Sequence, residues 1–427
     1  MNSNTLNPPH LRCRALFAVA TLTLAPLFGQ ESAALIDALI RKGILTHQEA
    51  EEIRADLGRD QKVMPARVAA GARSTGRLSV GMRMQIQYAN LDTDIDGPVF
   101  GPAATSHIFL RRMYLMLKAD IGRNWGAVFT YDFAGGGYDD AIVEWKPVPD
   151  LAFNFGLRKV NVGHEERASS GNIKAIERSS VTRYFVESNN GRRLGAASYR
   201  IGIFLDGKKS LTRDYGLVYS AAVTNPERGG TFSDAADSGD DTNNRVALWA
   251  NVGVTGKFEH NGTWTAGIGS GFLPDQGGAD AGHLGRGFDL SIHSIYADIS
   301  AGRFGFMAEY LTADIERGAS AAADASPRGF HLQPSLLLTD TIEAVIRYAW
   351  LDSDHRGVTL SDAIRSAPGG GTMNTFIEWY AGANWYFHGN DLKLQLGAVY
   401  GRTREALNGG PGEAETVGVR SQMQLQF

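Results

Sequence analysis

Basic side chains recur along most of the chain in short segments where polar and apolar residues alternate. The more polar face of these segments carries Arg83, Arg112, Lys118, Arg158, Arg200, Arg245, Arg303, Arg347, Lys393 and Arg420. A guanidinium group is a planar fork of hydrogen-bond donors that can hold a phosphate or carboxylate through two bonds. Arginines spaced along a water-filled path could therefore bind an anion in successive weak steps, which conduction requires because a single tight site would trap the ion.

Acidic residues share the same faces, so a second interpretation stays open. The acidic set comprises Asp120, Asp132, Glu144, Glu309, Glu343 and Glu378. Opposite charges can pair across a pore and cancel, in which case they only keep its interior wet. We expect a preference for anions, with selectivity for phosphate as the narrower hypothesis and a general or weakly selective pore as the alternative.

The last residues of the chain show the alternation most clearly. One face carries Val417, Val419, Met423, Leu425 and Phe427, and the other carries Gly418, Arg420, Gln422, Gln424 and Gln426. A strand with lipid on one side and water on the other shows this period of two. The terminal Phe427 resembles the assembly signal of bacterial outer-membrane barrels. The barrel assembly machinery is therefore an expected partner through Phe427, and outer-membrane lipid and lipopolysaccharide are the expected surroundings.

Sixteen alternating segments can be counted, an even number of the kind found in single-chain bacterial barrels. They begin near Gly76, His107, Trp125, Tyr138, Leu151, Tyr199, Arg213, Arg245, Gly262, Asp289, Arg303, Arg328, Thr341, Thr375, Asp391 and Glu415. Short connections alternate with mostly longer ones, as periplasmic turns alternate with extracellular loops. The pattern predicts an all-β fold: a 16-stranded antiparallel transmembrane β-barrel over residues 76–427, located in the bacterial outer membrane.

The residues before the barrel divide into three predicted parts. Residues 1–29 have the features of a secretory signal peptide, with Arg12 and Arg14 ahead of an apolar stretch that is shorter than the ~20 residues of a membrane-spanning helix. Residues 30–58 form a short helical hairpin, expected in the periplasm, and residues 59–75 form a basic linker. The hairpin is either a trimer-stabilising or cell-wall-contacting module or a plain spacer.

Several kinds of chemistry find no support in the sequence. Glycine clusters are not followed by the Lys-Ser or Lys-Thr of a nucleotide-binding loop, and the ten histidines show no metal-ligand spacing. The basic residues alternate along strands rather than clustering with aromatic residues, which argues against nucleic acid. We therefore expect no cofactor, no metal site and no catalytic residues. A barrel-anchored enzyme or adhesin is the less favoured alternative to a channel.

Several segments resemble the phosphate-selective porin O and P family. They are the run from Phe155 to Glu165, the Ile176-Glu177-Arg178 and Arg193-Leu194-Gly195 pair, and the hairpin around Gly382 to Tyr400. The resemblance covers roughly residues 76–427, although Asn161 stands where the family usually has proline. It implies a homotrimeric, sixteen-stranded channel with basic side chains lining the pore and small anions as solutes.

The connection from Asn161 to Ser198 is the candidate for a constriction. Its 38 residues are too many for a hairpin turn, and long loops usually have a function. It carries six basic and four acidic residues, a net charge of +2. Folded inward, it would narrow the pore and place Arg178 and Arg183 among the anion-binding residues. The alternative is an ordinary surface loop.

Overall fold

The computed structural model describes residues 76–96, 103–187, 193–226, 246–258, 262–274, 289–316, 324–369, 371–407 and 412–427. The predicted signal peptide, helical hairpin and linker lie outside the described residues. No helix among the described residues is long and apolar enough to cross a membrane.

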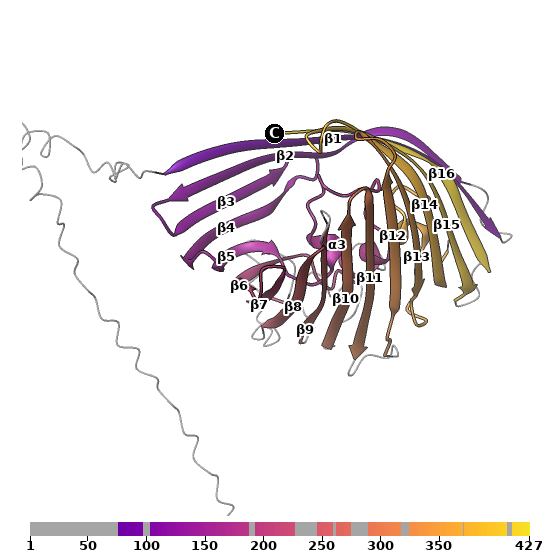
Figure 1. The fold of residues 1–427 in the computed structure, drawn as a ribbon. Helices are drawn as coiled ribbons and strands as arrows, with labels where there is room; N and C mark the ends of the chain where they lie inside the picture. Colours follow the sequence, from indigo (N-terminus) through magenta and orange to yellow (C-terminus); the bar gives the residue numbers. More distant parts are fainter. Residues whose placement is uncertain are drawn as a thin grey trace, which may run out of the picture. The chain divides into compact units, whose positions relative to one another are not determined.

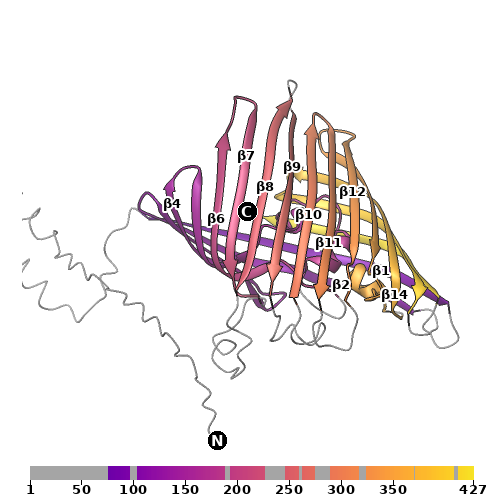
Figure 2. The same cartoon turned by 90° about the horizontal axis from the view of Figure 1, so that it is seen from below.

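Sixteen strands form one closed antiparallel barrel, in which each strand pairs with its neighbours in sequence and β1 pairs with β16 (Figure 1). The strands are β1 (Arg77–Asp96), β2 (Ala103–Ile121), β3 (Trp125–Asp132), β4 (Gly137–Val148), β5 (Leu151–Lys159), β6 (Tyr199–Ser210), β7 (Tyr215–Thr224), β8 (Ala247–Phe258), β9 (Gly262–Leu273), β10 (Asp289–Ala301), β11 (Phe304–Glu316), β12 (Arg328–Leu337), β13 (Ile342–Asp352), β14 (Met373–His388), β15 (Leu392–Ala406) and β16 (Glu413–Gln426). The predicted fold class is confirmed. In Figure 2, β7 to β12 run side by side along the wall.

The two faces of β16 behave as their alternation predicts. Val417, Val419 and Phe427 are exposed on the outer surface, where lipid would cover them. On the inner surface, Gln424 accepts a hydrogen bond from Gln85 at 2.7 Å and Gln422 accepts one from Gln87 at 2.7 Å. These side-chain pairs follow the seam between β1 and β16. Amide groups of opposite strands therefore satisfy each other where the barrel closes.

Phe427 completes the same seam through its backbone. Its N–H donates to the carbonyl of Met82 and its carbonyl accepts from the N–H of Met82, both at 3.1 Å. Each such bond contributes about 1 kcal/mol net, and the exposed ring adds an apolar anchor at the barrel end. We expect deletion of Phe427 to lower the yield of heat-modifiable barrel on gels severalfold. Deletion of residues 32–58 is the control, and equal yields from the two deletions would contradict the expectation.

The ring of Tyr380 on β14 occupies the space that glycines leave on β14 itself and on β15. A Cβ at Gly397 or at Gly382 would overlap the hydroxyl of Tyr380. Tyr380 therefore needs glycine at both positions. Its hydroxyl, held there, accepts a hydrogen bond from the N–H of Ile176 at 3.2 Å.

Two connections fold into the barrel. The long loop (residues 160–187 and 193–198) contains α3 (His164–Arg167) and α4 (Ser180–Phe185), and the second loop (residues 353–369 and 371–372) contains α6 (Leu360–Ala363). Figure 1 shows α3 within the curve of the strands. Apolar residues of both loops, among them Tyr184, Phe185 and Leu360, share one buried cluster. The inward fold of the long loop is one of the two predicted alternatives, whereas the second loop was not predicted to fold inward.

Candidate functional site

The long loop is attached to the inner wall by charged side chains of the strands. Glu309 on β11 accepts hydrogen bonds from the N–H groups of His164 at 2.5 Å and Glu165 at 3.1 Å. Lys393 on β15 donates to the carbonyls of Gly171 at 2.9 Å and Ile173 at 3.1 Å. Bonds to ionised groups are stronger than neutral ones. They hold the backbone of the loop against this side of the barrel.

Arg347 on β13 holds the middle of the loop. Its Nε donates to Glu378 on β14 at 2.9 Å and its Nη1 donates to the carbonyl of Glu177 at 3.0 Å. Glu378 accepts in turn from the N–H of Ser180 at 2.7 Å. Arg347 is 2% exposed. It is thus a buried support of the loop, and its charge is compensated by Glu378 and, at 3.6 Å, by Glu165.

Glu177 is the electrostatic centre of the long loop. Its carboxylate accepts hydrogen bonds from Arg111 at 3.0 Å, Arg365 at 3.2 Å and Gln87 at 2.8 Å, and Arg112 lies 4.0 Å away. Burial disfavours the charged form. The surrounding arginines outweigh burial and hold the pKa of Glu177 well below its ordinary value. The carboxylate therefore stays ionised at neutral pH.

Arg111 and Arg112 reach Glu177 together because β2 is irregular at this point. Gln85 pairs with Arg112 and Ile86 pairs with Leu110, which leaves Arg111 as an extra residue in the ladder. Such a β-bulge redirects one side chain relative to simple alternation. Two consecutive arginines can thus both face the interior.

The attachments of the loop leave open space beside β2 to β6. A cavity of about 680 Å³ lies between these strands and the long loop, and its lining residues define what we call the constriction. Eight basic side chains line it: Arg83, Arg111, Arg112, Arg158, Lys159, Arg167, Arg178 and Arg365. Five acidic ones line it too: Asp132, Asp139, Asp140, Glu166 and Glu187. The constriction therefore carries an excess of three positive charges.

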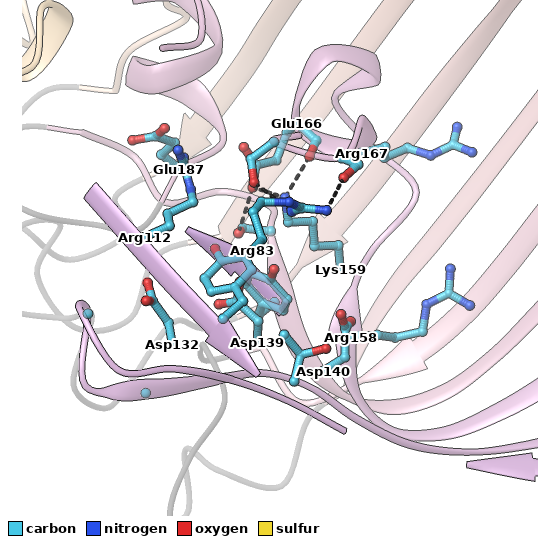
Figure 3. Close-up of a pocket in the computed structure, with 18 of the residues that line it drawn as sticks. Arg83, Arg112, Asp132, Asp139, Asp140, Arg158, Lys159, Glu166, Arg167 and Glu187 are labelled. Carbon is cyan, nitrogen blue, oxygen red and sulfur yellow. Dashed lines mark hydrogen bonds and ion pairs between the residues drawn. The ribbon is translucent and has the colours of Figure 1, made fainter. Parts of the chain in front are cut away.

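Acidic side chains lie on more than one side of the constriction. In Figure 3, Glu166 and Arg167 of the long loop lie on one side of the view, and Asp132, Asp139 and Asp140 lie on the opposite side. Lys159 donates to Glu166 at 2.8 Å. Basic and acidic side chains therefore lie next to one another around the constriction.

Most basic groups of the constriction are already paired. Besides Lys159, Arg178 lies 2.8 Å from Glu166, Arg365 lies 3.1 Å from Glu187, and Arg158 pairs with Asp206. Their charges are largely compensated before any solute arrives. Within the described ranges, no ion pair is found for Arg83 or Arg167.

Arg83 instead has neutral partners. Its guanidinium donates to the hydroxyls of Ser169 at 2.9 Å and Ser170 at 3.0 Å and to Gln426 at 2.9 Å. Hydroxyl and amide partners orient the group without compensating its charge. Arg167, on the same stretch of the loop as these serines, is exposed. These two arginines are the basic side chains of the constriction for which no carboxylate partner is found in the described ranges.

The predicted pore residues divide into groups in the structure. Arg83, Arg112, Arg158 and Arg178 line the constriction. Arg200, Arg347, Lys393 and Arg420 are buried inside the barrel. Of these, Arg200 donates to the carbonyl of Gly195 at 2.8 Å, and so supports the end of the long loop rather than presenting its charge to solute.

Other predicted residues lie elsewhere. Arg183 bonds to Glu187 at 3.0 Å and to the carbonyl of Ser361 at 3.1 Å, so it joins the two loops. Lys118 is exposed near the end of β2. Arg303 was expected in the pore wall, but it lies in the turn between β10 and β11, exposed and 2.8 Å from Asp340, because β11 begins one position later. Arg245 lies outside the described residues.

Sequence reasoning missed Arg111, Lys159 and Arg365 as residues of the constriction. Alternation selects one member of an adjacent basic pair, so Arg111 and Lys159 were passed over beside Arg112 and Arg158. Arg365 belongs to the second loop, whose apolar residues Val358, Leu360 and Ile364 were an available signal. A loop that lies in solvent does not usually carry apolar residues this close together.

Solved structures of outer-membrane proteins are similar to this chain. The anion-selective porin from Comamonas acidovorans is 11% identical, with a TM-score of 0.54, and the match covers 82% of this chain and 100% of that one. The outer membrane channel DcaP of Acinetobacter baumannii is 13% identical, with a TM-score of 0.48 and coverages of 83% and 99%. OmpT, an outer membrane protein of Vibrio cholerae, is 10% identical, with a TM-score of 0.49 and coverages of 83% and 100%.

No curated protein matches the chain. The family model described as phosphate-selective porin O and P matches residues 78–427, which is nearly the whole barrel. A closed sixteen-stranded barrel with an inward loop is an architecture that a channel can have, and the family model points to a channel as well. The protein is accordingly an outer-membrane porin that belongs to the phosphate-selective porin O and P family.

Proposed function

We propose that the protein lets small hydrophilic solutes diffuse passively across the outer membrane and prefers anions, phosphate among them. The observation that carries this proposal is the constriction, where eight basic side chains face five acidic ones and no ion pair is found for Arg83 or Arg167 within the described ranges. The name of the family and the anion selectivity of the Comamonas porin point in the same direction.

The physical argument rests on the walls of the passage. Unit charges 4 Å apart interact by ~1 kcal/mol in bulk water and by ~4 kcal/mol at the effective dielectric constant of ~20 typical near protein surfaces. A narrow passage with low-dielectric walls thus focuses the field of its excess charge on a passing ion. Because most arginines of the constriction are already paired with carboxylates, each contact that they can still make with a passing anion is weak. Weak successive contacts let the anion leave as well as enter.

Phosphate has an additional reason to bind at Arg83. The guanidinium fork can hold two oxygens of a tetrahedral oxyanion, and Ser169 and Ser170 place hydroxyl donors beside it. A monoatomic anion such as chloride uses only one such contact at a time. We therefore propose that phosphate competes with chloride at this position.

A general or weakly selective porin is the second candidate, and one observation favours it. Arg158, Lys159, Arg178 and Arg365 are all compensated by carboxylates. If Arg83 and Arg167 contribute little to the attraction of anions, the passage would select solutes by size alone.

Planar-bilayer recordings separate the two candidates. In a potassium chloride gradient, we expect the reversal potential to shift from zero towards the equilibrium potential of chloride. We also expect phosphate added at millimolar concentration to reduce the chloride conductance. A reversal potential near zero without phosphate block would establish the general porin instead. Three equal conductance steps per insertion would support the homotrimer that the family resemblance implies.

A further inference from the structure

Arg420 on β16 is a buried cation for which the pore has no evident use. It points into the barrel behind the long loop and is 4% exposed. Its Nη1 and Nη2 atoms are buried and have no hydrogen-bond partner among the described residues. Its partners in register, Ala89 on β1 and Gly397 on β15, offer no polar side chain. A buried guanidinium is stabilised when an anion or a hydrogen-bond acceptor lies beside it.

A small cavity adjoins this guanidinium. Its volume is about 10 Å³, room for one water-sized particle. Apolar side chains line part of it, and the charged lining consists of Arg178, Arg347, Arg365, Arg420, Glu177 and Glu378. Four arginines and two glutamates thus surround a space that holds one water-sized particle.

The other charged residues of this cavity have partners already. Arg347 bonds to Glu378 at 2.9 Å, Arg365 bonds to Glu177 at 3.2 Å, and Arg178 lies 2.8 Å from Glu166. Both glutamates of the lining attract Arg420 through space, but neither forms an ion pair with it among the described residues. Arg420 is therefore the arginine of this cavity for which no ion pair is found in the described part of the chain.

The cavity adjoins the pore. Arg178 and Arg365 line both the cavity and the constriction. Arg365 is partly exposed, at 27% of its side chain. The side chain of Arg365 therefore lies between the constriction and the cavity.

We infer that the cavity beside Arg420 binds one small monoatomic anion, such as chloride, as a structural ion. A water molecule could accept hydrogen bonds from Nη1 and Nη2, but it would bring no charge. A tetrahedral phosphate exceeds the space of one particle. A bound halide compensates Arg420 and strengthens the contact of the long loop, at Ile176 and Glu177, with β14 to β16. This ion stays in place while solute passes, so the inference does not depend on the selectivity proposed above.

Bromide provides a direct test because it replaces chloride and scatters anomalously. In crystals of the full-length protein grown in sodium bromide, we expect an anomalous peak at hydrogen-bond distance from Nη1 or Nη2 of Arg420. Absence of the peak, with a water in the cavity, would overturn the inference. This measurement needs neither a variant protein nor a conductance recording. Its failure can therefore be distinguished from a failure of the proposed selectivity.

Thermal unfolding gives an independent readout. An ion that binds only the folded state stabilises it increasingly as its concentration rises. We expect the unfolding temperature of the wild type to be a few degrees higher in sodium chloride than in sodium gluconate of equal ionic strength. R420M removes the charge and should lose this difference, whereas R303Q, in an exposed turn, should keep it. An equal difference in wild type and R420M would count against the site, and if R420M does not fold, the bromide peak decides.

Discussion

Replacement of both Arg83 and Arg167 by glutamine is expected to abolish the anion preference of the channel. These are the lining cations for which no ion pair is found within the described ranges, so their removal takes away the charge that a solute meets. A hydrogen bond to a charged group contributes ~1.5–3 kcal/mol. We therefore expect phosphate block of chloride current to weaken by about tenfold or more. Reversal potentials in a salt gradient measure the first effect, and phosphate titration of single-channel current measures the second.

The matched control is R303Q with R328Q. Both arginines are exposed at 58% of their side chains and lie at strand ends, where Asp340 and Asp352 pair with them. Water and salt screen such charges within ~8 Å at physiological ionic strength. Selectivity that shifts equally in both double variants, or in neither, would show that Arg83 and Arg167 are not the filter.

Arg178 and Arg183, which the sequence places in the constriction, make a poorer test. Arg178 donates to the carbonyl of Glu165 at 3.3 Å and to that of Ala168 at 3.1 Å, and Arg183 joins the two loops. A change of sign at either position would disturb the packing of the long loop. An altered current would then report the position of the loop rather than its charge.

Replacement of Glu177 by glutamine is expected to have the largest structural effect. Glutamine keeps the shape but leaves Arg111, Arg112 and Arg365 without their shared counter-charge. Breaking a buried ion pair costs about 3–5 kcal/mol, which corresponds to a shift of roughly 10²- to 4 × 10³-fold towards a displaced loop. We expect larger and noisier single-channel conductance, together with faster trypsin cleavage after Arg167 and Lys174. E144Q, which removes one partner of Lys146, is the control. Wild-type conductance and cleavage in E177Q would exclude Glu177 as the centre of the loop.

The pH dependence of the loop follows from the same residue. The pKa of Glu177 is held well below its ordinary value, because the surrounding arginines outweigh burial. Its contribution to stability is thus complete above the pKa of an unfolded glutamate and is lost as the pH falls from there through the folded pKa. Arginines also lower the pKa of Glu187. We expect the loop of the wild type to hold its position at neutral pH and to loosen in strong acid, where single-channel conductance recorded as a function of pH should rise.

The sequence alone determined the barrel and the inward side of most strands. Predicted starts at Trp125, Leu151, Tyr199, Gly262 and Asp289 coincide with those of β3, β5, β6, β9 and β10. Each strand has lipid on one side and water on the other. The period of two in its polar and apolar residues therefore indicates both that the segment is a strand and which of its faces points inward. The charges inside the barrel are visible in the sequence for the same reason.

Only the tertiary structure decided which of those charges a solute can use. Glu177 meets Arg111 on β2 and Arg365 on the second loop, and no local pattern records contacts between residues so far apart in sequence. The bulge at Gln85 and Ile86 is equally invisible, because either arginine of the adjacent pair satisfies the alternation. A charge is free or compensated according to the carboxylate that folding brings beside it. Arg83 therefore differs from Arg347 by its neighbours in space, although both occupy the same kind of position in their strands.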